Sequence, residues 1–147
     1  MKKVSDNYYV SSQISEEDLV SFKNEGFNLI VCNRPNGEEE NQTDFELIHK
    51  RCESIGLTFI NLPMIPGDLQ SELIFETKKI LDKNKKTLAY CRTGTRSIIL
   101  WACANVLKEK VDETIKVVSR AGYDLDHLRP MLDSIHSSSS VSYTHLR

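Results

Sequence analysis

A cysteine and two arginines lie in one short polar stretch, Tyr90-Cys91-Arg92-Thr93-Gly94-Thr95-Arg96-Ser97. A thiolate is a strong nucleophile, and positive charges or a helix N-terminus close to a thiol raise the fraction of thiolate at neutral pH. Arginine carries paired N–H donors that fit a planar or tetrahedral oxyanion. The stretch therefore predicts a reactive Cys91 with a lowered pKa at the rim of an anion site, and Arg96 as the residue that binds the anion.

The flanking residues place this stretch between a strand and a helix. Residues 87–90 form a short apolar run that is typical of a buried strand, and residues 98–104 are apolar almost all round, as in a buried helix. Gly94 permits the positive φ that a sharp turn between them often needs. The first amides of a helix have no partner within it, so they attract an anion.

We assign anion binding to this stretch and to one arginine of an earlier loop. Each assignment has a structural alternative: Cys91 could be a buried thiol, Arg96 could pair with a carboxylate at the edge of the core, and Arg92 could point to solvent. The agreement between motif, strand-to-helix context and adjacent arginines favours a reactive cysteine. The predicted substrate-binding residues are Arg92, Thr93, Gly94, Thr95, Ser97 and Arg34.

Two other strand-to-loop junctions could contribute to the same site. Arg34 and Glu38 follow an apolar run and could orient the Cys91 loop or line its mouth, although an ion pair that only closes a turn would look the same. Asp68 follows a proline-stiffened loop. It is a candidate general acid, and it is also an ordinary N-cap for the helix that follows.

Strand patterns alternate with helix patterns along the chain, which predicts an α/β layer structure with a mainly parallel sheet. Ligands bind beyond the carboxyl ends of such strands, so we expect the Arg34, Asp68 and Cys91 loops to open on one edge. The predicted strands are 8–10, 27–32, 57–62 and 87–90. The predicted helices are 15–25 with Ser15 as N-cap, 43–54 with a Thr43–Glu46 capping box, 69–81, 98–104, 111–121 and 125–135, the last bent or restarted at Pro130.

The composition restricts partners and location. The chain has 147 residues and a formal net charge of −2, so there is no overall attraction to nucleic acid or to an anionic membrane. The residues that follow Met1-Lys2-Lys3 are mostly polar, and no apolar run approaches membrane-spanning length. We therefore expect a cytoplasmic protein. Residues 1–136 are predicted to form a single domain, and 137–147 a disordered polar tail that is typical of a read-through fragment.

The remaining cysteines and histidines are interpreted as structural or surface residues. The cysteines form no CxxC pair, and neither residue type shows the spacing of metal ligands, so no metal or cofactor is predicted. We also place Trp101 and Tyr123 in the core. The cysteines are Cys32, Cys52 and Cys103, and the histidines are His49, His127, His136 and His145.

Several separated motifs resemble the phosphatase-like domain of the bacterial β-lactamase hydrolase-like family, whose members are also labelled sulfur transferases. The likeness covers about residues 6–135. It implies the three-layer fold of cysteine-dependent, dual-specificity protein phosphatases, with a mainly parallel central sheet flanked by helices, a cysteine nucleophile and an arginine that binds phosphoryl oxygens. The motifs are Val10-Ser11-Ser12-Gln13-Ile14, Gly26-Phe27, Asn33-Arg34-Pro35-Asn36-Gly37-Glu38, the Cys91 stretch with Leu100-Trp101-Ala102, and Ala121-Gly122-Tyr123-Asp124-Leu125.

The loop spacing differs from the phosphatase signature, which has five residues between cysteine and arginine and usually a histidine before the cysteine. Here four residues separate Cys91 from Arg96, and Tyr90 precedes the cysteine. This spacing resembles the active loop of rhodanese-type sulfurtransferases. A shorter loop has a smaller ring of amides, which could suit a persulfide better than a phosphate monoester.

Three functions therefore remain open. The leading hypothesis is hydrolysis of phosphate monoesters through a phosphocysteine on Cys91, with an anionic small molecule or a phosphoprotein as substrate. The alternative is sulfur transfer through a Cys91 persulfide, with Arg96 holding thiosulfate or another sulfur donor. A third hypothesis is a non-catalytic module that binds phosphate or senses oxidation through its thiol.

Overall fold

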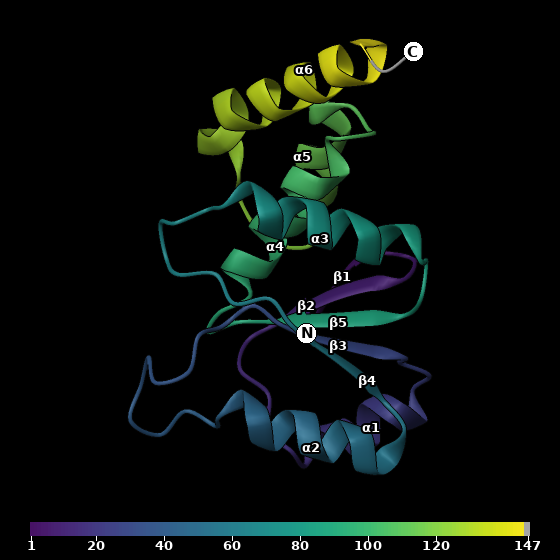
Figure 1. Cartoon of the computed structure of the whole chain (residues 1–147), viewed down its shortest axis with the longest axis vertical. Coiled ribbons are helices and arrows are strands. Elements are labelled where there is room, and N and C mark those ends of the chain that lie inside the picture. The colour runs from purple at the N-terminus through teal and green to yellow at the C-terminus, as the bar shows by residue number, and fades with distance from the viewer. Residues whose placement is uncertain (146–147) are drawn as a thin grey trace.

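A five-stranded sheet with helices on both faces forms the molecule, as Figure 1 shows for this computed structural model. The structure describes residues 1–145, with side chains described for residues 1–139. The strand order is β1-β2-β5-β3-β4, in which β1 is antiparallel to β2 and the other neighbours are parallel. The three-layer α/β fold with a mainly parallel sheet, predicted from the sequence, is confirmed.

The elements follow one another in the order that the sequence predicts, with one extra strand at the start. The strands are β1 (Lys2–Ser5), β2 (Tyr8–Ser11), β3 (Leu29–Cys32), β4 (Thr58–Asn61) and β5 (Thr87–Tyr90). The helices are α1 (Asp18–Asn24), α2 (Phe45–Ile55), α3 (Ser71–Asp82), α4 (Thr95–Asn105), α5 (Val111–Arg120), the 3₁₀ turn η1 (Asp126–Leu128) and α6 (Arg129–His145).

The central strand β5 is buried along its whole length, because β2 and β3 pair with its two edges and helices cover both faces. Leu88 and Tyr90 point into the core shared with α1 and α2, and Ala89 points into the core shared with α3, α4 and α5. A strand that is buried on both faces reads as a continuous apolar run, which is why it could be predicted. Its carboxyl end delivers Cys91 to one edge of the sheet.

Helix α4 is the most deeply buried helix of the described chain, since it packs against α3 and α5 as well as the sheet. Trp101 is 3% exposed, which confirms it as a core residue. Within the described residues no helix is both long and apolar enough to cross a membrane.

The capping box predicted for α2 is wrong. Asp44, not Thr43, is the N-cap, and it makes no side-chain cap bond. The side chain of Asn36 takes this role from the preceding loop: its Oδ1 accepts the Phe45 N–H at 2.9 Å, and its Nδ2 donates to the Glu46 carboxylate at 2.9 Å. The loop after β3 is thereby attached to the start of α2.

Other helix ends also differ from the prediction. Helix α1 begins at Asp18 rather than at a Ser15 cap, because the Asp18 carboxylate accepts the Ser15 N–H at 2.9 Å and closes a turn before the helix. Strand β1 was not predicted, since its residues are mostly exposed and polar. Such an edge strand has only a weak sequence pattern.

The C-terminal helix is longer than predicted. It begins at Arg129, so the chain does restart next to Pro130, which sits in the first turn where a missing N–H costs nothing. It then continues to His145, because no glycine or proline follows Ile135 to end it. The segment predicted as a disordered tail is therefore helical where the structure describes it, and residues 146–147 lie outside the described residues.

Candidate active site

Cys91 is the first residue after β5, and two backbone hydrogen bonds attach its loop to the end of β2 and to the segment just after it. The Cys91 N–H donates to Ser11 O at 3.2 Å, and Arg92 O accepts the Gln13 N–H at 3.4 Å. The loop then turns into α4, which begins at Thr95. The strand-to-helix junction predicted for the reactive cysteine is therefore present.

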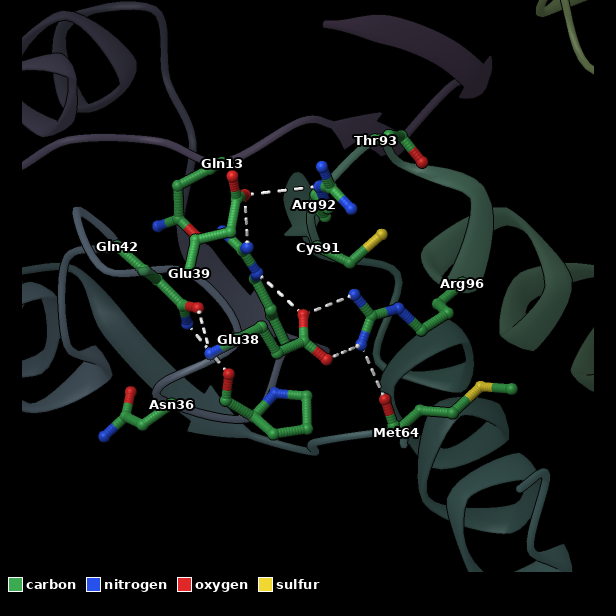
Figure 2. A network of polar contacts seen from close by, with 12 residues as sticks. Gln13, Asn36, Glu38, Glu39, Gln42, Met64, Cys91, Arg92, Thr93 and Arg96 are labelled. Atoms are coloured by element: carbon green, nitrogen blue, oxygen red, sulfur yellow. Dashed lines mark hydrogen bonds and ion pairs between the residues drawn. The ribbon is translucent and has the colours of Figure 1, made fainter. Parts of the chain in front are cut away.

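The Cys91 sulfur accepts a hydrogen bond from the Gly94 N–H at 3.1 Å. The sequence predicts this sulfur at the rim of an anion site, and the residue is only 1% exposed. The reason is the tightness of the turn, which folds the exposed residues Arg92, Thr93 and Thr95 around the thiol. In Figure 2 the Cys91 side chain points toward the space between Thr93 and Arg96.

Gly94 has φ +90°, the left-handed conformation that was predicted for it, and it is the N-cap of α4. A Cβ at this position would lie 2.2 Å from the Tyr123 hydroxyl, so even alanine would clash. The Tyr123 hydroxyl donates to Thr93 O at 3.2 Å. Tyr123 packs against the core as expected, but it is only partly buried, and its polar end reaches the Cys91 loop.

Arg96 is held by a carboxylate. Its Nη1 and Nη2 donate to the two oxygens of Glu38 at 2.8 and 2.7 Å, and Nη1 also donates to Met64 O at 2.8 Å (Figure 2). Arg96 thus forms the ion pair with a carboxylate that the sequence left open as the alternative to anion binding. A guanidinium has a second donor edge at Nε, and Arg96 Nε makes no hydrogen bond to any described residue.

Arg34 is almost completely buried, with only 2% of its side chain exposed. Its Nε donates to Glu38 at 2.8 Å, one terminal nitrogen donates to Glu39 at 2.7 Å, and the other donates to Gln13 at 2.9 Å. A buried guanidinium with every nitrogen paired is a satisfied group. This arrangement orients Glu38 and Glu39, whereas the sequence had placed Arg34 among the substrate-binding residues.

Glu38 stays ionised. Hydrogen bonds from Arg96 and, more weakly, from Arg34 hold the pKa of its carboxyl below the usual value against the opposing effect of burial. Glu38 therefore cannot act as a proton donor near neutral pH. The ion pairs continue from Glu39 to Arg92 at 3.2 Å, so three arginines and two glutamates form one chain of alternating charges with a net charge of +1.

The remaining residues predicted to bind substrate occupy different positions. Ser97 is fully buried, and its hydroxyl donates to Asn33 Oδ1 at 2.8 Å, so it joins the loop after β3 to α4. The hydroxyls of Thr93 and Thr95 lie 3.0 Å apart at the exposed surface of the loop. Within the predicted set, the threonines and Arg92 are the side chains that an approaching ligand meets first.

Asp68 is exposed and lies at the end of the loop after β4. The prediction that it caps α3 is wrong, because Gln70 is the N-cap and Asp68 instead accepts a bond from Gln70 Nε2 at 3.3 Å. Among the described residues it makes no hydrogen bond to the Cys91 loop. Its own loop does reach the site, because the Met64 carbonyl binds Arg96. The three loops that follow β3, β4 and β5 therefore meet at one edge of the sheet, as predicted.

Several contributors were not assigned to the site from the sequence, among them Met64, Gln13 and Tyr123. Met64 acts through its backbone carbonyl, which has no side-chain signal. Gln13 and Tyr123 lie within motifs that carried the family resemblance, yet neither residue type points to this chemistry. Their presence in separated motifs was the one available signal.

The other cysteines are structural. Cys32, Cys52 and Cys103 are buried, and burial raises the pKa of Cys52 to about 11 and that of Cys103 to about 12. Over the described part of the chain, no group of three or more histidine, cysteine or acidic side chains is arranged to hold a metal ion.

A cavity of about 340 Å³ adjoins the charged chain on the side of Glu39. It is open to solvent and lined by polar and charged residue types, and it lies next to the residues that bind Arg92 and Arg34. Such a cavity can receive the part of a substrate that extends away from the thiol. Its lining residues are Gln13, Arg34, Glu39, Glu40, Asn41 and Gln42.

Comparisons with known proteins show a family match and a shared fold. The family model described as "Beta-lactamase hydrolase-like protein, phosphatase-like domain" matches residues 1–108. A β-lactamase hydrolase-like protein of Xylella fastidiosa (strain Temecula1) is 25% identical over 125 residues, which are 83% of this chain and 29% of the relative. The chain thus spans less than a third of the length of that relative.

Solved structures share the fold. The crystal structure of a candidate phosphatase from Neisseria meningitidis Z2491 is 36% identical, with a TM-score of 0.77 over 91% of this chain and 96% of that one. Tk-PTP in its active form has a TM-score of 0.72 at 16% identity, covering 92% of this chain and 95% of its own. The second likeness concerns the fold alone.

Proposed function

The chain belongs to the family of phosphatase-like domains of β-lactamase hydrolase-like proteins, and on that premise we propose that it hydrolyses phosphate monoesters with Cys91 as the nucleophile. The substrate is an anionic small molecule or a phosphoprotein. The four free cysteines suit the reducing cytoplasm, which we include in the proposal.

One observation carries the proposal: the Cys91 sulfur lies at the N-terminus of α4 and accepts the Gly94 N–H at 3.1 Å. A hydrogen bond and a helix N-terminus both favour a negatively charged sulfur. The same amides and the net positive charge of the arginine–glutamate chain favour an anion next to it.

The reaction proceeds in two steps. The Cys91 thiolate attacks phosphorus, the bond from phosphorus to the leaving oxygen breaks, and a phosphocysteine forms. Water then attacks the phosphocysteine, which releases inorganic phosphate and restores the thiol. Glu38 fixes Arg96 through Nη1 and Nη2, so the Nε edge is the one that remains to bind phosphoryl oxygens.

The proton for the leaving group needs a separate donor. Glu38 is unsuitable because Arg96 and Arg34 keep it ionised. We assign this role to Asp68, which lies exposed on the loop whose Met64 carbonyl binds Arg96. Closure of that loop over a bound substrate would bring the carboxyl group to the leaving oxygen.

The proposal is tested by assaying aryl phosphate hydrolysis and thiocyanate formation from thiosulfate and cyanide side by side. We expect phosphate release that Cys91→Ser abolishes and that Cys52→Ala retains, since Cys52 is a buried cysteine of α2 in the core on the opposite face of the sheet from α4. A phosphoryl adduct on the Cys91 peptide after rapid acid quenching would identify the intermediate. Phosphate release that is unchanged in Cys91→Ser would refute the proposal.

Sulfur transfer is the second candidate, and the loop spacing favours it. Four residues separate Cys91 from Arg96, and the single loop amide that reaches the sulfur is that of Gly94 among the described contacts. Such a loop could hold a persulfide better than a phosphoryl group. Thiocyanate formation that depends on Cys91, without phosphate release, would replace the first candidate by this one.

A non-catalytic module is the third candidate, because Cys91 is buried and Glu38 already occupies one edge of Arg96. In that case neither activity would exceed that of Cys91→Ser, while phosphate would still bind. Reversible oxidation of Cys91 would then indicate a redox sensor.

A further inference from the structure

One peptide group of the active loop is bound at both of its ends. The carbonyl of Thr93 and the N–H of Gly94 belong to the same peptide unit. The carbonyl accepts a hydrogen bond from the Tyr123 hydroxyl at 3.2 Å, and the N–H donates to the Cys91 sulfur at 3.1 Å. The Cys91 sulfur is thus connected through this peptide to the side chain of Tyr123, which lies thirty residues after Thr93 in the sequence.

The geometry of a peptide group makes the two bonds dependent on each other. In a planar trans peptide, the C=O and N–H vectors point in opposite directions. A donor that holds the carbonyl on one side therefore directs the N–H to the other side. Without that donor, the peptide could rotate and remove its N–H from the sulfur, because glycine tolerates many backbone conformations.

We propose that Tyr123 is a positioning residue for the nucleophile: its hydroxyl fixes the Thr93–Gly94 peptide so that the Gly94 N–H points at Cys91 and favours the thiolate. The inference deepens the proposed function and rests on Cys91 being its nucleophile. Tyr123 touches neither the sulfur nor the expected substrate position through a hydrogen bond in the described chain, so its effect passes through the peptide.

The surroundings of Tyr123 suit this role. Its ring packs against the core cluster that contains residues of α4 and α5, and its backbone N–H donates to Val118 O at 3.2 Å. Both contacts fix the position of the hydroxyl. The hydroxyl would lie only 2.2 Å from a Cβ at position 94, which shows how closely it sits over the glycine. Burial, and to a lesser extent a negative charge on Cys91, raise the pKa of Tyr123, so the phenol keeps its proton and remains a donor.

The Tyr123→Phe variant removes the hydroxyl and keeps the aromatic ring. The readout is the rate at which iodoacetamide alkylates Cys91 as a function of pH, followed by mass spectrometry of the Cys91 peptide. We expect the midpoint of this profile to move to higher pH by about 1–2 units, the size of one lost hydrogen bond to the charged form. Tyr9→Phe is the matched control, because Tyr9 packs on Phe27 and takes no part in the Cys91 loop.

Two outcomes bear directly on the proposal. A midpoint that moves upward in Tyr123→Phe and stays in place in Tyr9→Phe supports it. A midpoint that is the same in both variants and in the unchanged protein overturns it, and so does a loss of thermal stability in Tyr123→Phe with an unchanged profile, since that would show a purely structural role.

A second pair of variants keeps the test independent of overall stability. Gly94→Ala places a methyl group against the Tyr123 hydroxyl, and Tyr123→Phe removes that oxygen. If the hydroxyl sits over the peptide as described, Gly94→Ala will shift the alkylation profile less in the Tyr123→Phe background than in the unchanged protein. Equal shifts in the two backgrounds would contradict the proposal.

The experiment separates this inference from the proposed function, because alkylation needs no substrate. If the protein hydrolyses phosphate esters but the alkylation profile of Tyr123→Phe is unshifted, only the positioning role of Tyr123 is refuted. If the profile shifts but the protein hydrolyses no phosphate ester, the positioning role is supported and the proposed reaction is refuted.

Discussion

Glu38 binds both terminal nitrogens of Arg96, at 2.8 and 2.7 Å, although the two residues are 58 positions apart in the sequence. The same carboxylate accepts a bond from the buried Arg34 at 2.8 Å. A single residue of the loop after β3 therefore orients the arginine of the Cys91 loop. It also fixes which edge of that arginine remains for a ligand.

Replacing Glu38 by glutamine should weaken both function and stability. Glutamine has one acceptor oxygen and a donor NH2 group, so it cannot accept a bond from Arg96 on both terminal atoms as Glu38 does. The arginine then loses its fixed orientation, and Arg34 keeps only Glu39 and Gln13. We expect kcat/KM for an aryl phosphate to fall by about 10-fold or more and the free energy of unfolding to fall by about 1–3 kcal/mol. Steady-state kinetics and urea unfolding measure the two effects.

The control for this change is Glu40→Gln, which alters an exposed glutamate two positions away. It removes the same charge from the same loop without touching Arg96. Equal losses in the two variants would mean that only the loop's overall charge matters.

The stability due to Glu38 should depend on pH in a defined direction. Arg96 and Arg34 hold the pKa of this carboxyl below its ordinary value of 4.5, so the folded state binds the proton more weakly than the unfolded state. Its contribution is complete above the ordinary value and is lost as the pH falls through the lowered value. The difference in unfolding free energy between the unchanged protein and Glu38→Gln should therefore shrink in acid. A difference that grows below pH 4.5 would contradict the ion pairing.

Asp68→Asn tests the assignment of the general acid. A proton donor matters most when the leaving group is a poor one, so hydrolysis of an alkyl phosphate should fall by about 100-fold or more, and hydrolysis of a nitrophenyl phosphate much less. The measurement is kcat for both substrates. Asp82→Asn, which changes an exposed aspartate at the end of α3, is the control. A uniform reduction for both leaving groups would indicate that Asp68 is not the donor.

Asn36→Ala should destabilise the start of α2. It removes the acceptor of the Phe45 N–H and the donor to Glu46, and the loss of such a cap costs about 1 kcal/mol. Thermal or urea unfolding measures the change. Thr43→Ala should have a much smaller effect, because Thr43 is not the N-cap. A larger loss of stability in Thr43→Ala than in Asn36→Ala would favour the Thr43–Glu46 capping box over the Asn36 cap.

Short-range patterns were enough to predict the layers of the fold and the place of Cys91 between a strand and a helix. The apolar run of β5, the turn at Gly94 and the apolar face of α4 are local properties, and hydrophobic periodicity reports them directly. The alternation of strands and helices then required parallel neighbours, which brought the loops after β3, β4 and β5 to one edge.

Only the tertiary structure decided which groups meet at that edge. Each polar side chain has several local partners of similar energy, so the sequence left the ion pair of Arg34 and Glu38 open and gave no reason to choose Asn36 over Thr43 as a cap. The burial of Cys91, the Met64 carbonyl on Arg96 and the Tyr123 hydroxyl on Thr93 all depend on the path of the chain between distant residues. Patterns of a few residues determine which faces are buried, whereas contacts across tens of residues are determined only when the packed core fixes the backbone.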